Sequence, residues 1–155
     1  MSKWSGISSR LPATINDRQP VVISSKTVAS ALLPCTFVTE GASAFTQATA
    51  FGPNLRLLIN RDFYSIGQFD AVDPLKTAYA SGDTVSAAVL EPGQNYMVAV
   101  AAATYTFGQE VTVAASGRAA GAASTNVVVG FAREAGAKSA GDLMQIEICM
   151  PYVKA

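Results

Sequence analysis

Residues 93–148 read GQNYMVAVAAATYTFGQEVTVAASGRAAGAASTNVVVGFAREAGAKSAGDLMQIEI, and this stretch decides the fold class. Short runs rich in alanine and valine alternate in it with turns that contain glycine, proline or serine. Strands this short and closely spaced are typical of antiparallel barrels and sandwiches. The sequence therefore predicts an all-β protein, built as a small antiparallel β-barrel or a sandwich.

The last run shows which side of its strand faces the core. In a strand from Leu143 to Met150, successive side chains point to opposite faces. One face carries polar residues, and the other consists of Met144, Ile146 and Ile148. We expect this second face to be buried.

Upstream of this stretch we expect further short strands and one short helix. The strands are predicted at residues 21–24, 35–39, 54–59 and 84–90. Asp73 is suited to cap a helix, Pro74 to be its first residue and Gly82 to follow its end, which predicts a helix over residues 73–82. Residues 25–33 could add one or two helical turns before Pro34. Residues 20–155 are expected to form a single β-rich domain.

Residues 1–19 are predicted to be an extended N-terminal arm, because polar and single apolar residues mix there without a period. Up to Ser30 the chain carries Lys3, Arg10, Arg18 and Lys26 against Asp17 alone, a net charge of +3. The whole chain has a formal charge of zero, so the remainder carries −3. A basic arm is thus joined to an acidic body.

The composition bears on partners and compartment. At 155 residues, the chain is expected to be one domain. Half of the residues are apolar and only 14% are charged, which suggests that partners cover part of the surface; the alternative is an alanine-rich domain with an ordinary surface. The neutral total charge predicts no nucleic-acid or membrane partner. The longest apolar run, Met97 to Ala103, is too short to span a membrane, and the N-terminus lacks a secretory core, so we expect synthesis in the cytoplasm.

The residues available for chemistry are few. The sequence has no histidine, which excludes Ser-His-Asp and Cys-His nucleophile systems and the usual zinc enzymes. Cys35 and Cys149 form no CxxC pair and are expected to be two thiols rather than a disulfide. Asp70 and Asp73 are three apart, but Asp73 is better explained as a helix cap. No phosphate-binding loop is present. We therefore expect no enzyme activity, cofactor or metal site.

Three motifs carry a resemblance to a known family: GQEVTVAASGRAA at Gly108–Ala120, VVVGFAREAG at Val127–Gly136 and GDLMQIEI at Gly141–Ile148. This part of the chain resembles the C-terminal part of the small decoration, or cement, proteins of tailed-bacteriophage capsids. Each motif has a physical basis. Gly117, Gly136 and Gly141 suit tight turns with positive φ, Gly130 allows a close approach of backbones, and Asp142 can bond to local amides.

The resemblance implies a structural virion protein on the outer face of the capsid, which reinforces the contacts between capsomers. It also implies a small β-barrel or β-tulip core, the major capsid protein as partner, and a homo-oligomer, with a trimer favoured and a dimer as the alternative. The main alternative function is a receptor- or carbohydrate-binding module of a head fibre or tail. A hydrolase that uses two facing carboxylates is a third, weaker alternative.

Interface residues are expected in the arm and among isolated aromatic and basic residues. A tryptophan close to a chain terminus has little core to enter, so Trp4 is expected to dock into capsid or a sister subunit; it could instead fold back over its own domain. The candidate interface residues are Trp4, Ile7, Arg10, Leu11, Arg18, Tyr64, Tyr79 and Arg118. Arg118 could meet a carboxylate of a partner, or could be a solvated turn residue.

Overall fold

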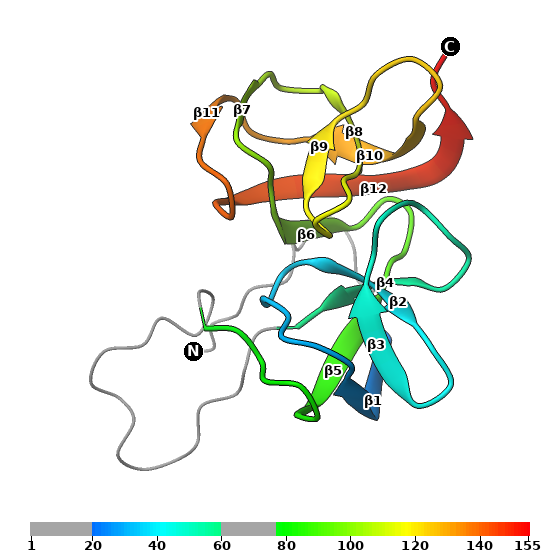
Figure 1. Cartoon of the computed structure of the whole chain (residues 1–155). Coiled ribbons are helices and arrows are strands. Elements are labelled where there is room, and N and C mark those ends of the chain that lie inside the picture. Colours follow the sequence, from blue (N-terminus) through cyan, green and yellow to red (C-terminus); the bar gives the residue numbers. More distant parts are fainter. Residues whose placement is uncertain (1–19, 60–76) are drawn as a thin grey trace, which may run out of the picture.

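The computed structural model describes residues 20–59 and 77–155, and all the regular structure in these ranges is β. The chain forms a closed five-stranded barrel, a five-stranded antiparallel sheet stacked on it, and a two-stranded sheet (Figure 1). Its strands are β1 (Val22–Val28), β2 (Phe37–Glu40), β3 (Ala44–Gln47), β4 (Leu55–Leu58), β5 (Thr84–Val89), β6 (Asn95–Ala99), β7 (Ala103–Tyr105), β8 (Glu110–Val113), β9 (Ala119–Gly121), β10 (Val127–Ala132), β11 (Gly136–Lys138) and β12 (Leu143–Val153).

The barrel has the strand order β1-β3-β2-β4-β5 and is closed by antiparallel pairing of β1 with β5. Pairing is antiparallel throughout, except between β1 and β3, which run parallel. Its interior is filled by apolar side chains: Val28, Leu32, Val38, Phe45, Leu58, Tyr79, Val85 and Ala87. The all-β class with a small barrel is thus confirmed. The barrel lies outside residues 93–148, on which the prediction is based, and contains one parallel pair that the sequence did not indicate.

The second sheet has the order β6-β12-β10-β8-β9, and β11 pairs with β7 beside it. β12 is the longest strand and lies between β6 and β10 (Figure 1). Met144, Ile146 and Ile148 are buried and alternate with half-buried residues, so the predicted core face of this strand is confirmed.

A second core joins the barrel to this sheet. The barrel half contributes Phe37, Ala48, Leu55, Leu57 and Ala88, and the sheet contributes apolar residues from β6, β8, β10 and β12. Backbone hydrogen bonds cross the same boundary. The N–H of Ala99 donates to the carbonyl of Cys35 at 2.8 Å, so β6 is tied directly to the start of the barrel wall.

Gly130 lies where the backbone of β12 approaches closely, as predicted. A Cβ built on it would lie 2.4 Å from the carbonyl oxygen of Glu147 on β12, closer than real side chains come. The pairing register of β10 and β12 shifts between Val128 and Gly130. Only glycine fits this close contact without a shift of the backbone.

The predicted helix over residues 73–82 is wrong within the described part of the chain. Tyr79 instead forms a β-bridge with Leu32, in which each N–H donates to the other's carbonyl at 2.8 and 3.2 Å. Residues 81 and 82 form a turn, and residues 73–76 lie outside the described residues. Pairing with a segment distant in sequence has overridden the local capping signals.

The helical turns considered for residues 25–33 are also wrong for residues 25–28, because these belong to strand β1. Ser25 has a φ of 71° at the register shift between Ile23 and Lys26, so β1 bends there and continues along β5. The predicted arm, residues 1–19, lies outside the described residues. Residues 20–59 and 77–155 contain no helix long and apolar enough to cross a membrane.

Candidate functional site

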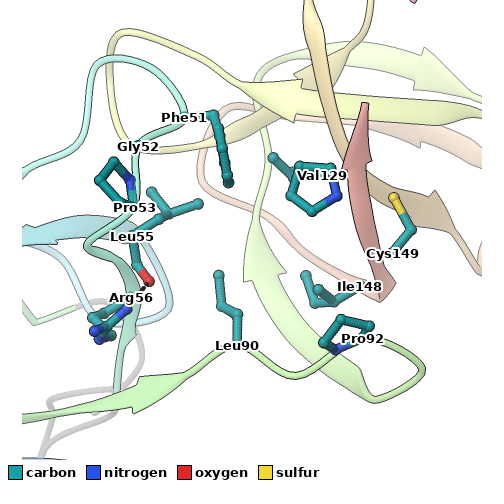
Figure 2. Close-up of a pocket in the computed structure, with 11 residues that line it drawn as sticks. Phe51, Gly52, Pro53, Leu55, Arg56, Leu90, Pro92, Val129, Ile148 and Cys149 are labelled. Atoms are coloured by element: carbon teal, nitrogen blue, oxygen red, sulfur yellow. Dashed lines mark hydrogen bonds between the residues drawn. The ribbon is translucent and has the colours of Figure 1, made fainter. Parts of the chain in front are cut away.

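A cleft of about 180 Å³ opens between the barrel and the C-terminal sheet (Figure 2). The loop before β4 contributes Phe51 and Pro53, the loop after β5 contributes Leu90 and Pro92, and β10 and β12 form the opposite wall. In Figure 2, Phe51 and Leu90 point toward one another from the two loops, and Val129 and Ile148 lie on the other side of the space between them. The residues that line the cleft are Phe51, Gly52, Pro53, Leu55, Arg56, Leu90, Pro92, Val129, Ile148, Cys149 and Pro151.

Arg56 is the one cation among the described residues that line the cleft, and its charge is already compensated. Its Nη2 lies 2.9 Å from Oε2 of Glu40, and Glu40 also accepts a 2.6 Å hydrogen bond from Lys26. This hydrogen bond from Lys26, with the charges of both cations, lowers the pKa of Glu40. The cleft therefore offers an apolar surface and no uncompensated charge.

The end of β12 presents a second apolar surface. β6 pairs with β12 as far as Glu147, and Gly93 and Gln94 bond to Ile148 beyond it. Among the described strands, the residues after Ile148 have β10 alone as a neighbour. Met150 is 73% exposed and Val153 65% exposed. Tyr152 is held in place, since its hydroxyl donates to Glu110, which also pairs with Lys154 at 2.8 Å. Exposed apolar side chains on an ordered strand are typical of a contact surface for a partner.

The cysteines are two thiols, as expected, and they lie in different surroundings. Cys35 is buried between the barrel and β6, and this burial raises its pKa to about 11. Cys149 is half-buried in the wall of the cleft, and burial raises its pKa as well. Both thiols are neutral near pH 7, which is unfavourable for a nucleophile.

The described residues offer binding surfaces rather than a reactive constellation. Among residues 20–59 and 77–155, no three His, Cys, Asp or Glu side chains gather in a way that could hold a metal ion. The described residues that line the cleft include no carboxylate, and neither do those of a smaller pocket beside Arg118. Neither pocket thus supplies the pair of carboxylates that a glycosidase would require.

The fold matches a solved structure. The crystal structure of the N base of the head fiber protein gp8.5 in bacteriophage phi29 superposes with a TM-score of 0.52 at 15% sequence identity. The match covers 88% of this chain and 100% of that one. This chain shares its fold with a phage head-fiber base. No protein-family model matches the sequence, and no curated protein does.

The structure describes two of the predicted interface residues. Tyr79 is only 6% exposed, and its hydroxyl donates to the carbonyl of Ile59 at 2.9 Å inside the barrel. Its ring is part of the core and is not available as a surface anchor. Arg118 is half-buried at the junction of barrel and sheet, where it lines the smaller pocket. The other candidates lie outside the described residues: Trp4, Ile7, Arg10, Leu11, Arg18 and Tyr64.

Sequence reasoning did not identify the cleft or the exposed end of β12. The cleft brings together residues 51–56, 90–92 and 148–151, and only the tertiary fold places these segments side by side. The sequence did contain a signal for the end of β12. Strand-like residues continue past Met150 through Val153, and here apolar residues occur on both faces of the strand. A strand apolar on both faces needs cover on both, and residues 150–153 of β12 are exposed on both faces.

Proposed function

We propose that this chain is a structural protein of a tailed-phage head, which binds the outer surface of the assembled capsid and stabilises the contacts between capsomers. The observation that carries the proposal is the likeness of fold, over 88% of the chain, to the base of a phage head fiber. The resemblance of residues 108–148 to capsid decoration proteins supports it independently, because it rests on sequence motifs.

The physical mechanism is linkage between binding and assembly. A protein that binds the assembled shell and not its free subunits stabilises the shell by RT ln(1 + [L]/Kd) at each site. Many copies, each bound weakly, together stabilise the shell strongly against the pressure inside the capsid. Burial of apolar surface contributes about 25 cal/mol for each Å² removed from water. The cleft and the exposed apolar residues of β12 are among the described surfaces that supply such area.

We propose a homotrimer as the bound form, with a dimer as the alternative, and the major capsid protein as the partner. The basic arm of residues 1–19 is proposed as a contact with capsid or with a sister subunit, because its charge complements an acidic surface. Removal of residues 2–18 should then weaken binding to capsids. Unchanged binding after this removal would overturn the role of the arm.

The experiment is co-sedimentation of the purified protein with expanded capsids that lack it, followed by thermal disruption of those capsids with and without it. Saturable binding and a raised disruption temperature are expected. The Met150→Ser/Val153→Ser double variant should bind more weakly, whereas Met97→Ser, on β6, is a control that also removes a partly exposed methionine. No binding of the wild-type protein to capsids would overturn the proposal.

A second function, a head-fiber or tail module that binds a receptor or carbohydrate, is favoured by two observations. The solved neighbour is the base of a fiber. In addition, Phe107 is 68% exposed, so aromatic surface is displayed to a ligand. The guanidinium of Arg133 lies over the ring, 5.5 Å from its centroid. Binding to host cells or glycans by the isolated protein, lost in Phe107→Ala, would support this function over the first.

A further inference from the structure

Arg118 follows a turn that is fixed to the barrel. The turn joins β8 to β9, and its Gly117 carbonyl accepts a 2.6 Å hydrogen bond from the N–H of Phe37 on β2. Nε2 of Gln47, at the end of β3, donates to the carbonyl of Ala115 at 3.0 Å. These two bonds join the turn to different barrel strands, so the backbone that positions Arg118 is rigid.

Arg118 is a cation that has no partner among the described residues. Within residues 20–59 and 77–155 it forms no salt bridge and no side-chain hydrogen bond, and its Nε is buried with no acceptor. Nη2 of Arg118 lies near Gly141, at ordinary contact distance from where a Cβ on that glycine would be. The carboxylate of the next residue, Asp142, accepts a hydrogen bond from the N–H of Ser139 and none from Arg118. The other cations in the same ranges all lie within 4 Å of a carboxylate: Lys26, Arg56, Arg133, Lys138 and Lys154.

A pocket of about 150 Å³ lies against this side chain. It is lined by Ala31, Leu33, Thr36, Gln47, Ser116 and Arg118. Besides the guanidinium, the hydroxyl of Ser116 and the second amide hydrogen of Gln47 are donors, while the Thr36 hydroxyl is used in a 2.6 Å bond to the carbonyl of Leu33. Ala31 and Leu33 provide an apolar wall. The pocket thus combines hydrogen-bond donors with room for a short aliphatic stem.

We propose that this pocket receives one carboxylate side chain, an aspartate or glutamate, from the capsid protein that this chain binds; the identity of the partner rests on the function proposed above. A planar guanidinium pairs with a carboxylate through two parallel hydrogen bonds. A half-buried guanidinium without a partner loses hydration and gains nothing in return, and a bound carboxylate removes this deficit.

A single negative charge fits the pocket better than a phosphate group. A phosphate carries up to two charges and is usually held by several cations or by a nest of backbone N–H groups. Among the described residues that line this pocket, Arg118 is the one ionisable group. The charge of the pocket therefore matches that of one carboxylate.

The site itself is tested by NMR of the arginine Nε–H groups of the full chain, with sodium acetate as the probe and sodium chloride at the same ionic strength as the reference. Acetate is expected to shift the Arg118 signal saturably, while the signals of the other arginines respond as they do to chloride. The shift should be absent in Arg118→Gln. An Arg118 signal that responds equally to both salts would overturn the carboxylate site.

The partner is tested by co-sedimentation with capsids that lack the protein. Arg118→Gln should bind at least about tenfold more weakly, and Arg118→Lys should recover only part of the loss because it lacks the planar fork. Lys138→Gln removes the same charge from a paired surface lysine and is the matched control. Equal melting temperatures of the wild type and Arg118→Gln would show that weaker binding of the variant does not come from a loss of folding stability.

The outcomes distinguish the site from the proposed function. An acetate shift together with unchanged capsid binding of Arg118→Gln would overturn the capsid partner and point to another acidic ligand, such as a sugar acid. Failure of the wild type to bind capsids would overturn the proposed function and this partner with it. The acetate titration would then still decide, by itself, whether the pocket binds a carboxylate.

Discussion

The backbone N–H of Phe37 donates a 2.6 Å hydrogen bond to the carbonyl of Gly117, and this bond joins the barrel to the C-terminal sheet. Phe37 is fully buried in the core that both halves share. Gly117 has a φ of 69°, and a Cβ on it would lie 2.7 Å from the Phe37 carbonyl oxygen. The two halves therefore depend on each other at a point where only glycine fits.

Gly117→Ala is expected to destabilise the protein by about 2–4 kcal/mol, because it adds a steric overlap to an unfavourable positive φ. Gly108→Ala is the matched control, since Gly108 has a φ of 80° but open space around its Cβ position. It should cost about 1 kcal/mol, the conformational part alone. The free energy of unfolding of both variants is measured in urea. Equal losses in the two variants would contradict the close contact between turn and barrel.

Two methionines of β12 test the assignment of core and surface. Met144 is fully buried and Met150 is 73% exposed. Met144→Ala should lower the free energy of unfolding by about 2–5 kcal/mol, because it leaves a cavity in the shared core. Met150→Ala should change it by less than about 0.5 kcal/mol. A large loss of stability in Met150→Ala would show that this residue is not the surface residue described here.

Tyr105 tests a buried hydrogen bond. Its hydroxyl donates to the carbonyl of Ala101 at 2.9 Å, and the side chain is 1% exposed. Tyr105→Phe should cost about 1–2 kcal/mol, because the half-buried carbonyl of Ala101 and the buried carbonyl of Ala119 lose a donor. Tyr152→Phe, which removes a bond at the surface, should cost less. Thermal unfolding of both variants measures the difference, and the reverse order would contradict the burial of Tyr105.

Glu40 is expected to make stability depend on acid pH. Its hydrogen bond from Lys26 lowers its pKa in the folded state below the ordinary value near 4.5. The stabilisation is therefore fully present above that ordinary value and is lost as the pH falls through the lowered pKa. The free energy of unfolding of the wild type should exceed that of Glu40→Gln by up to about 1 kcal/mol at neutral pH. The difference is small because the ion pair is partly exposed and screened. The difference should shrink on acidification; a constant difference would argue against this ion pair.

The two thiols are expected to differ in reactivity. Burial raises the pKa of Cys35 to about 11, so near pH 8 its thiolate fraction is roughly a hundredfold or more below that of an exposed cysteine. Cys149 is half-buried beside the cleft and should react first with a disulfide reagent. Cys149→Ser should leave a protein that reacts only as it unfolds. Rapid modification of this variant would contradict the burial of Cys35.

The class of the fold could be predicted because its signals are local. Alternation along residues 143–148 places the core face of β12, and burial of Met144 and Ile146 confirms it. Gly117, Gly136 and Gly141 all have positive φ, as their turn positions indicated. Asp142 bonds to a nearby amide, also as expected. Strand pleating and turn geometry depend on neighbours within a few residues, so one chain segment suffices to reveal them.

The sequence alone therefore determined an all-β chain with short strands, a buried face on β12 and glycine turns. Only the tertiary structure decided that β1 closes the barrel on β5, that β3 runs parallel to β1, and that Tyr79 pairs with Leu32 in place of a helix. It also decided that Arg118 meets a pocket formed with Gln47 from the other half. These features depend on contacts between segments distant in sequence, whose free energy exceeds the small local propensities that a sequence displays.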